Sequence, residues 1–173
     1  MLSYQHIYHA GNHADVLKHL TLTMLLSHLN EKDKPYTVFD THAGAGRYSL
    51  EDDRALKTGE AGAGIKKLLA SEQAAGFAAN VQTANSASPE DSLASYKQYL
   101  ALCRAYSERS LYPGSPEIER CFMRKCDTLI LSELHPQAIE ELRTSVQMPV
   151  MYSTTIPEKN AQYTDAEYET VAP

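Results

Sequence analysis

The sequence lacks several features that would each point to a particular class of protein. Its 173 residues include no tryptophan, only three cysteines, and no apolar run near the roughly 18 residues of a membrane-spanning helix. The cysteines are odd in number and lack the Cys-x-x-Cys spacing, which favours reduced thiols in a cytoplasmic protein. The N-terminus has no apolar segment typical of a secretory signal. We therefore expect neither a membrane protein nor a disulfide scaffold.

Positive charge is also scarce. The 16 Lys and Arg residues against 22 Asp and Glu residues give a formal net charge of −6, which argues against a long basic surface for nonspecific nucleic-acid binding. A small RNA-reading pocket needs only a few hydrogen-bond donors and stays open as an interpretation. With 43% hydrophobic and 22% charged residues, the chain is expected to fold as one domain, with or without a tail.

Histidine, in contrast, is concentrated near the N-terminus, where six of the seven lie within the first 42 residues. A polar segment that packs its imidazoles without a ligand is the ordinary explanation. A metal site is the alternative, because His9 and His13 have the i, i+4 spacing of two ligands on one helix face. Gly11 and Asn12 between them disfavour a helix at that point.

Hydrophobic periodicity predicts an α/β protein. The expected helices are 12–30, most of 51–110, 116–125 and 137–146, and the expected strands are 36–40, 128–132 and a short 150–152. Asn12 is a good N-cap for the first helix, with Asp15 in the capping-box position. The second half of this helix is apolar nearly all round and is expected to be buried. The segment 112–116 reads as a rigid turn, and the polar segment after 152 is expected to be poorly ordered.

The end of strand 36–40 carries the most informative motif, Asp40-Thr-His42-Ala-Gly44-Ala-Gly46. A strand that ends in an acid and leads into Gly-x-Gly is typical of a nucleoside-cofactor loop, because glycine lets the backbone turn sharply and approach a ligand. A second Ala-Gly-Ala-Gly at 61–64 follows no strand and is interpreted as a loop before a helix. A tight structural turn remains the alternative for Gly44 and Gly46.

Glu133 ends the second strand, where an acid can accept both hydroxyls of a ribose. It lies much further along than the roughly 20 residues usual after the glycines, so residues 51–110 are expected to be an insertion. The alternative is a solvated acid at a strand end.

Four motifs in order, MLSYQHIYHAGNHADVLKH, DKPYTVFDTHAGAGRYSL, YPGSPEI and LSELHP, closely resemble the bacterial 23S rRNA adenine-N6 methyltransferases of the RlmJ type over about residues 1–145. The resemblance implies an α/β, Rossmann-like methyltransferase fold with a helical subdomain inserted after the first strand. The divisions it implies are 1–50 and 111–152 for the methyltransferase domain, 51–110 for the insertion and 153–173 for the tail.

The resemblance also implies a site. Its cofactor is S-adenosylmethionine and its substrate a specific adenine of 23S rRNA, taken as protein-free RNA. The implied cofactor-binding residues are Lys18, His19, His42, Gly44, Gly46, Ser115 and Glu133. Tyr4 and His6 belong to the N-terminal motif that reaches the target base, which suits an unstacked adenine in need of an aromatic face.

The departure from the family is as informative as the match. The family's Asp-Pro-Pro-Tyr motif is absent, so no catalytic residue is identified, and the resemblance fades after about residue 147. We expect a C-terminally truncated or frameshifted chain with an incomplete sheet and weak or no catalysis alone. The unpaired sheet edge invites dimerisation.

Two other functions stay open. The first is a non-catalytic half-domain that binds a cofactor or a partner. The second, more distant, is an NAD-type oxidoreductase, which fits the Gly-x-Gly loop but has Ser49 where a third glycine belongs.

Overall fold

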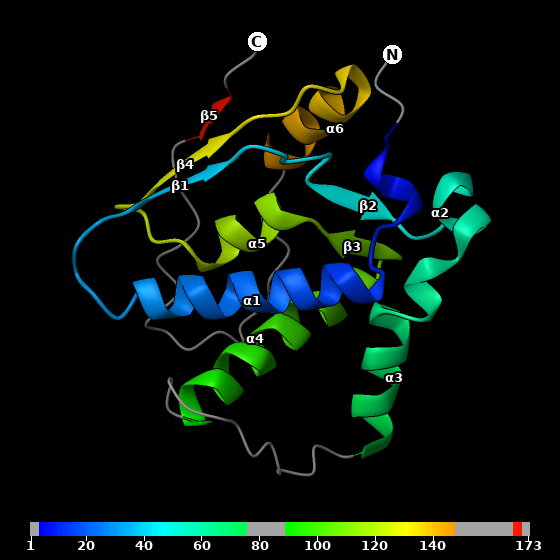
Figure 1. Cartoon of the computed structure of the whole chain (residues 1–173), viewed down its shortest axis with the longest axis horizontal. Helices are drawn as coiled ribbons and strands as arrows, with labels where there is room; N and C mark the ends of the chain where they lie inside the picture. The colour runs from blue at the N-terminus through cyan, green and yellow to red at the C-terminus, as the bar shows by residue number, and fades with distance from the viewer. Residues whose placement is uncertain (1–3, 76–88, 148–167, 171–173) are drawn as a thin grey trace.

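The computed structural model describes residues 4–75, 89–147 and 168–170, which contain both helices and strands (Figure 1). In chain order the elements are η1 (His6–Tyr8), α1 (His13–Leu29), β1 (Thr37–Asp40), β2 (Arg47–Ser49), α2 (Asp53–Thr58), η2 (Glu60–Gly62), α3 (Ile65–Ala75), α4 (Pro89–Ser107), β3 (Leu111–Pro113), α5 (Ser115–Phe122), β4 (Thr128–Leu131), α6 (Pro136–Gln147) and β5 (Tyr168–Thr170). No helix in these segments is long and apolar enough to cross a membrane. The chain is thus a mixed α/β protein.

The larger sheet is built on two parallel strands, β1 and β4, as their β-branched and aromatic residues predict. Its order is β1-β4-β5. Backbone pairing continues past the strands: the amide of Ser132 donates to the carbonyl of Asp40 (2.8 Å), and the amide of Ala43 donates to the carbonyl of Ser132 (3.0 Å). The loop after β1 and the residues after β4 therefore meet at the carboxyl edge of the sheet.

The third strand of this sheet is β5, which pairs in parallel with β4. It comes from the segment after residue 152, for which the sequence predicts no regular structure. The strand predicted over 150–152 lies outside the described residues. The third strand of this sheet therefore comes from a segment whose polar composition does not predict a strand.

A second, antiparallel sheet joins β2 to β3, with Tyr48 opposite Tyr112. Neither strand is predicted from the sequence, in which Tyr112 belongs to an expected turn, because three-residue strands are too short to show an alternating pattern. The amide of Leu50 also donates to the carbonyl of Ser110 (2.7 Å). The two ends of the helical segment 51–110 therefore lie side by side.

The first helix begins as predicted, with the Asn12 side chain accepting a hydrogen bond from the amide of Asp15. The expectation that its second half is buried all round is wrong. Leu25 is 54% exposed and Met24 is 36% exposed, because α4 and α5 pack along one stripe of the helix. The buried stripe consists of Asp15, His19, Thr23 and Leu26. Three of these four side chains are polar, so this face is held by hydrogen bonds as well as by apolar contact.

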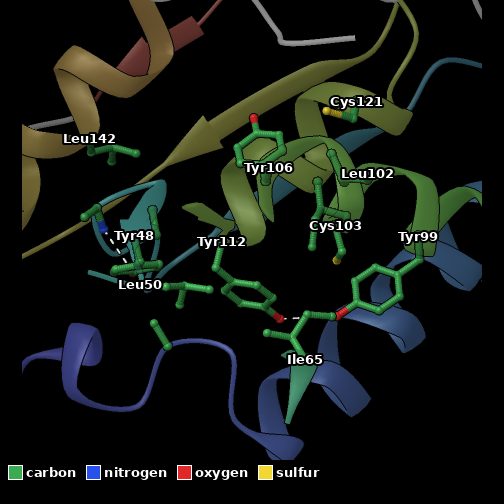
Figure 2. Packing of buried hydrophobic residues seen from close by; sticks show 14 of the residues in the cluster. Tyr48, Leu50, Ile65, Tyr99, Leu102, Cys103, Tyr106, Tyr112, Cys121 and Leu142 are labelled. Carbon is green, nitrogen blue, oxygen red and sulfur yellow. Dashed lines mark hydrogen bonds between the residues drawn. The ribbon is translucent and has the colours of Figure 1, made fainter. Parts of the chain in front are cut away.

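Tyrosines from α4 and β3 fill much of the core (Figure 2). Tyr99 and Tyr106 of α4 lie seven residues apart on one helix face, and the hydroxyls of Tyr99 and Tyr112 are 3.2 Å apart. All three cysteines are free, and burial raises the pKa of the Cys103 thiol to about 12. Helices α3 and α4 therefore share one continuous core with the sheets.

Candidate cofactor and substrate site

A cavity of about 820 Å³ opens beside the carboxyl ends of β1 and β4. Its volume lies in the range of small-molecule and cofactor pockets. Eight of the nine site residues expected from the sequence line it: Tyr4, His6, Lys18, His19, His42, Gly44, Ser115 and Glu133. They come from the N-terminal segment, from α1, from the loop after β1, from the start of α5 and from the turn after β4. Gly46 is the exception.

The two glycines of the loop after β1 have different surroundings. Both have positive φ angles, +61° for Gly44 and +78° for Gly46. A Cβ on Gly44 would lie 2.1 Å from the Tyr48 hydroxyl, on the cavity side. A Cβ on Gly46 would lie 3.1 Å from Leu142 Cδ1, and the Gly46 carbonyl accepts a hydrogen bond from the amide of Gly114 (2.8 Å). Gly46 thus shapes the loop against α6, whereas Gly44 lines the cavity.

Glu133 is held by backbone amides on both of its carboxylate oxygens. Oε2 accepts from the amide of Gly44 (2.8 Å) and Oε1 from the amide of His135 (2.7 Å). Each carboxylate oxygen keeps a further lone pair, so both can still accept from a ligand hydroxyl. The acid after β4 is therefore joined directly to the glycine loop after β1.

Asp40 connects the same loop to the start of α5. The Ser115 hydroxyl donates to Asp40 Oδ2 (2.6 Å), and the amide of His42 donates to Asp40 Oδ1 (2.9 Å). The His42 ring is exposed, and its Nδ1 lies 2.8 Å from the Thr41 hydroxyl. Ser115 and His42 are thus brought together through an acid that the sequence presents only as the end of a strand.

The N-terminal segment forms a chain of polar contacts along the cavity. The Tyr4 hydroxyl lies 2.8 Å from His6 Nδ1, and His6 Nε2 lies 2.8 Å from Asp15 Oδ2. Asp15 is only 2% exposed and also accepts from the amide of Gly11 (3.0 Å). Burial opposes ionisation of Asp15, but the hydrogen bond and charge of His6, together with the charge of His19 and the hydrogen bond from the Gly11 amide, outweigh it, so the pKa of Asp15 is lowered. The His6 ring also packs edge-on to Tyr48, with centroids 5.2 Å apart.

His19 lies deeper, and Lys18 beside it is exposed. His19 Nδ1 is 2.7 Å from the Tyr112 hydroxyl. Burial lowers the pKa of His19 to about 4, so the ring is neutral at physiological pH. Lys18 Nζ lies 3.8 Å from Asp15 Oδ1. The site therefore places a neutral imidazole next to a solvated ammonium group.

Sequence reasoning missed Asp15, Tyr48 and Arg54 as cavity residues. An acid in the first turn of a helix is typical of a cap, and Asp15 does donate its amide to Asn12 Oδ1 (2.9 Å). Its carboxylate, however, turns to Gly11 and His6, partners that a local pattern does not reveal. Tyr48 and Arg54 carry no signal in the sequence.

His9 and His13, the pair with metal-ligand spacing, do not share a helix. His9 follows η1 and its Nδ1 lies 2.9 Å from Glu60 Oε1, whereas His13 is exposed at the start of α1. The i, i+4 spacing therefore does not place their rings on one helix face.

Comparison with known proteins identifies the family of this chain. Residues 33–160 match the family model described as ribosomal RNA large subunit methyltransferase D, RlmJ. The chain belongs to the RlmJ family. The match of this RlmJ-family chain runs to residue 160, beyond the position near 145 where its recognisable motifs end.

Individual relatives agree with the RlmJ assignment. The chain is similar to the ribosomal RNA large subunit methyltransferase J of Escherichia coli (strain K12), 39% identical over 150 residues that cover 85% of this chain and 47% of that protein. It is equally similar to the enzyme of that name from Haemophilus influenzae, 39% identical over 84% of this chain and 47% of that protein. The chain thus spans about half the length of the curated relatives it matches.

A solved structure also resembles most of the chain. A crystal structure of a protein from Legionella pneumophila superposes with a TM-score of 0.64 and 30% identity, covering 94% of this chain and 48% of the other. The α/β arrangement of this RlmJ-family chain therefore recurs in about half of a longer protein.

Proposed function

We propose that this RlmJ-family chain provides the cofactor-binding half of an S-adenosylmethionine-dependent methyltransferase that modifies the N6 amine of a specific adenine in 23S rRNA. The observation that carries the proposal is that the N-terminal motif, the glycine loop and Glu133 line one and the same cavity. The fold is then a Rossmann-like methyltransferase domain, 1–50 and 111–152, with residues 51–110 inserted into it.

The residues present fit S-adenosylmethionine. Gly44 lines the cavity and leaves room for the Tyr48 hydroxyl, which a Cβ would displace. Glu133 can accept the ribose hydroxyls, and Lys18, His19, His42 and Ser115 line the same cavity. When bound, this cofactor supplies an electrophilic methyl group. The role of these side chains is to bind and orient it.

Tyr4 and His6 are proposed to contact the target base. The Tyr4 ring is 64% exposed at the cavity and stacks on the His9 ring, with centroids 5.7 Å apart and planes at 10°. An exposed aromatic face of this kind is what an unstacked base needs. With a net charge of −6, recognition of RNA then rests on shape and a few contacts rather than on a basic surface.

Calorimetric titration with S-adenosylhomocysteine tests the cofactor half of the proposal. We expect saturable binding that Glu133→Gln weakens about tenfold, because the ribose loses a charged acceptor. Glu140→Gln, on the exposed face of α6, is the matched control and should bind as the unchanged chain does. No detectable heat at millimolar ligand from a folded sample would contradict the proposal.

Methyl transfer to unmodified 23S rRNA tests the other half. We expect weak or no transfer by this chain alone, because it has no Asp-Pro-Pro-Tyr acceptor for the amine. Robust turnover would show that other residues do the work of that motif. The second candidate function, a non-catalytic half-domain, is favoured if the chain forms a discrete dimer with no affinity for S-adenosylhomocysteine.

A further inference from the structure

The second Ala-Gly-Ala-Gly, at 61–64, lies where the helical segment meets the N-terminal segment. A Cβ on Gly64 would lie 2.1 Å from the Gly11 carbonyl oxygen, and that oxygen accepts a hydrogen bond from the amide of Ile65 (2.9 Å). The two backbones are therefore in direct contact, and only glycine fits at position 64. Figure 1 shows the N-terminal segment with η1 beside α2, which it contacts. The start of the helical segment thus supports the N-terminal segment.

Glu60, directly before this motif, holds two side chains of the N-terminal segment. Its Oε1 lies 2.9 Å from His9 Nδ1, and its Oε2 accepts a hydrogen bond from Asn12 Nδ2 (2.9 Å). The hydrogen bonds of Asn12 and His9 lower the pKa of Glu60, so the group that holds them is an ionised carboxylate at neutral pH. Asn12 Oδ1 in turn accepts from the amide of Asp15 (2.9 Å). One carboxylate therefore joins the helical segment to the residues on both sides of Gly11.

The His9 ring held by Glu60 lies against the Tyr4 ring. The two ring planes differ by 10° and the centroids are 5.7 Å apart, an offset stack. Tyr4 is 64% exposed and lines the cavity, whereas neither His9 nor Glu60 is among the described residues that line it. His9 covers one face of the Tyr4 ring and leaves the opposite face for a ligand. Glu60 therefore acts on Tyr4 through the His9 ring.

We propose that Glu60 is a positioning residue that, through His9, fixes the Tyr4 ring as a stacking surface for a nucleobase. A ring whose plane is held before binding loses less side-chain freedom when a base stacks on it, so the complex is tighter. Tyr4 is the group that touches the base, and Glu60 touches neither base nor cofactor. The inference deepens the proposed function and rests on it, because Tyr4 is there the contact of the target base.

The first test needs no ligand. In the isotope-labelled full chain, we expect nuclear Overhauser contacts between the ring protons of Tyr4 and His9. Glu60→Ala should remove these contacts, because the His9 ring loses its partner. Unchanged amide shifts in β1 and β4 would show that the variant is folded. A Tyr4–His9 ring contact that persists in Glu60→Ala would overturn the inference.

Two further variants accompany Glu60→Ala. Glu31→Ala is the matched control, because it removes another solvent-accessible His–Glu pair, in which His28 Nδ1 lies 3.2 Å from Glu31 Oε2. It should leave the Tyr4–His9 ring contact intact. Glu60→Gln keeps the length of the side chain and one acceptor oxygen but loses the charge. It should weaken the ring contact less than Glu60→Ala does, and it carries the test if the alanine variant does not fold.

Stacking is measured with adenosine monophosphate, added to the chain saturated with S-adenosylhomocysteine so that the cofactor's own adenosine position is filled. The titration follows the Tyr4 ring signals by NMR. We expect Glu60→Ala to lower the affinity for the nucleotide about fivefold, a part of what a whole base–aromatic stack contributes. The affinity for S-adenosylhomocysteine should not change. An unchanged nucleotide affinity, or an equal fall in both affinities as a merely structural role would give, would overturn the inference.

A double variant shows whether Glu60 acts through His9. His9→Ala should lower the nucleotide affinity about as much as Glu60→Ala does, and the two together should lower it no further, because both remove the same support. Losses that multiply would overturn the inference. If S-adenosylhomocysteine does not bind, the proposed function fails separately, and the ring contact and the nucleotide affinities are then compared without it. A nucleotide that does not bind the unchanged chain would overturn the inference.

Discussion

At the scale of single residues, Gly44 and Tyr48 are packed too closely to leave room for a side chain at position 44. The Tyr48 hydroxyl occupies the space where Gly44 would have a Cβ, and it accepts a hydrogen bond from the amide of Ala45 (3.1 Å). Burial raises the pKa of Tyr48, so this hydroxyl remains a neutral partner of the loop. Glycine at position 44 is therefore required by contact and by backbone angle together.

Gly44→Ala should destabilise the fold by about 1–3 kcal/mol, because it combines a positive φ angle with a clash against Tyr48. It should also abolish binding of S-adenosylhomocysteine. Gly62→Ala, in the second Ala-Gly-Ala-Gly, is the matched control, since nothing lies within 4 Å of its added Cβ. Urea denaturation and calorimetry measure both effects. A Gly44→Ala variant as stable as Gly62→Ala would contradict this account.

Glu119 is a buried acid whose Oε2 has no hydrogen-bond partner among the described residues. Burial, together with the charge of Asp40, raises the pKa of Glu119 from 4.5 to about 9, so the folded chain holds a proton that the unfolded chain releases. Stability should therefore fall as pH rises between these values, by about 1.4 kcal/mol per pH unit from this group.

Glu119→Gln should remove that slope between pH 7 and 8, because glutamine carries no titratable proton. The free energy of unfolding, measured at several pH values for both chains, gives the difference. Glu140→Gln, on an exposed position, should keep the slope of the unchanged chain. Parallel slopes for the unchanged chain and Glu119→Gln would show that the Glu119 carboxyl is not protonated in the fold.

At the scale of elements, α6 is attached to the loop after β1 by polar contacts at Ser145. Its hydroxyl donates to the carbonyl of Ala45 (2.9 Å), and its carbonyl accepts from Arg47 (2.9 Å) and Arg120 (3.3 Å). Arg120 also forms a buried ion pair with Glu117 at 3.1 Å, and Glu117 accepts from the Tyr106 hydroxyl. One arginine therefore couples α5 to α4 and α6.

Arg120→Ala should destabilise the chain by about 3–5 kcal/mol, because it leaves the buried Glu117 carboxylate without its positively charged partner. The exposed pair of Arg143 with Glu140 on α6 is the natural control, and Arg143→Ala should cost less than about 1 kcal/mol. Chemical denaturation of the two variants measures the contrast. Similar losses for both would mean that burial of the Arg120 pair does not matter.

The sequence predicts the long or strongly patterned elements and misses those defined by distant partners. Strands 36–40 and 128–132 and helix 12–30 follow from side-chain type and capping, and all three occur close to these bounds. The pair β2–β3 and the polar stripe of α1 cannot be predicted from local sequence, because the residues that they contact lie far away along the chain. His19 meets Tyr112, and Arg47 meets Ser145. The contacts of Tyr4 with His6 and of His6 with Asp15 are not predicted for the same reason.

At the scale of the whole molecule, β1 forms one edge of the three-stranded sheet in the described part of the chain. Its Phe39 side chain is 58% exposed. An edge strand with an exposed aromatic residue is a surface on which a second copy can pair. We therefore propose that the chain self-associates through β1.

Phe39→Lys should reduce that association, because a charge on an edge strand opposes pairing. Sedimentation velocity over a range of concentrations measures it, and we expect the unchanged chain to form a dimer where the variant stays a monomer. Leu56→Lys replaces an equally exposed apolar side chain on α2 and should leave the dimer intact. A dimer that survives Phe39→Lys would exclude β1 as the contact.

The antiparallel pair β2–β3 has a further consequence for how the molecule opens. Ser49 and Leu111 face each other, so the helical segment leaves and rejoins the chain through a narrow stem. Yet Ile65, Tyr99 and Tyr106 from that segment fill the same core as Leu129 of β4. Residues 51–110, which the sequence indicates to be an insertion, are therefore expected to fold together with the rest of the domain. Amide protons of α4 and β4 should exchange with solvent through the same cooperative opening rather than one after the other.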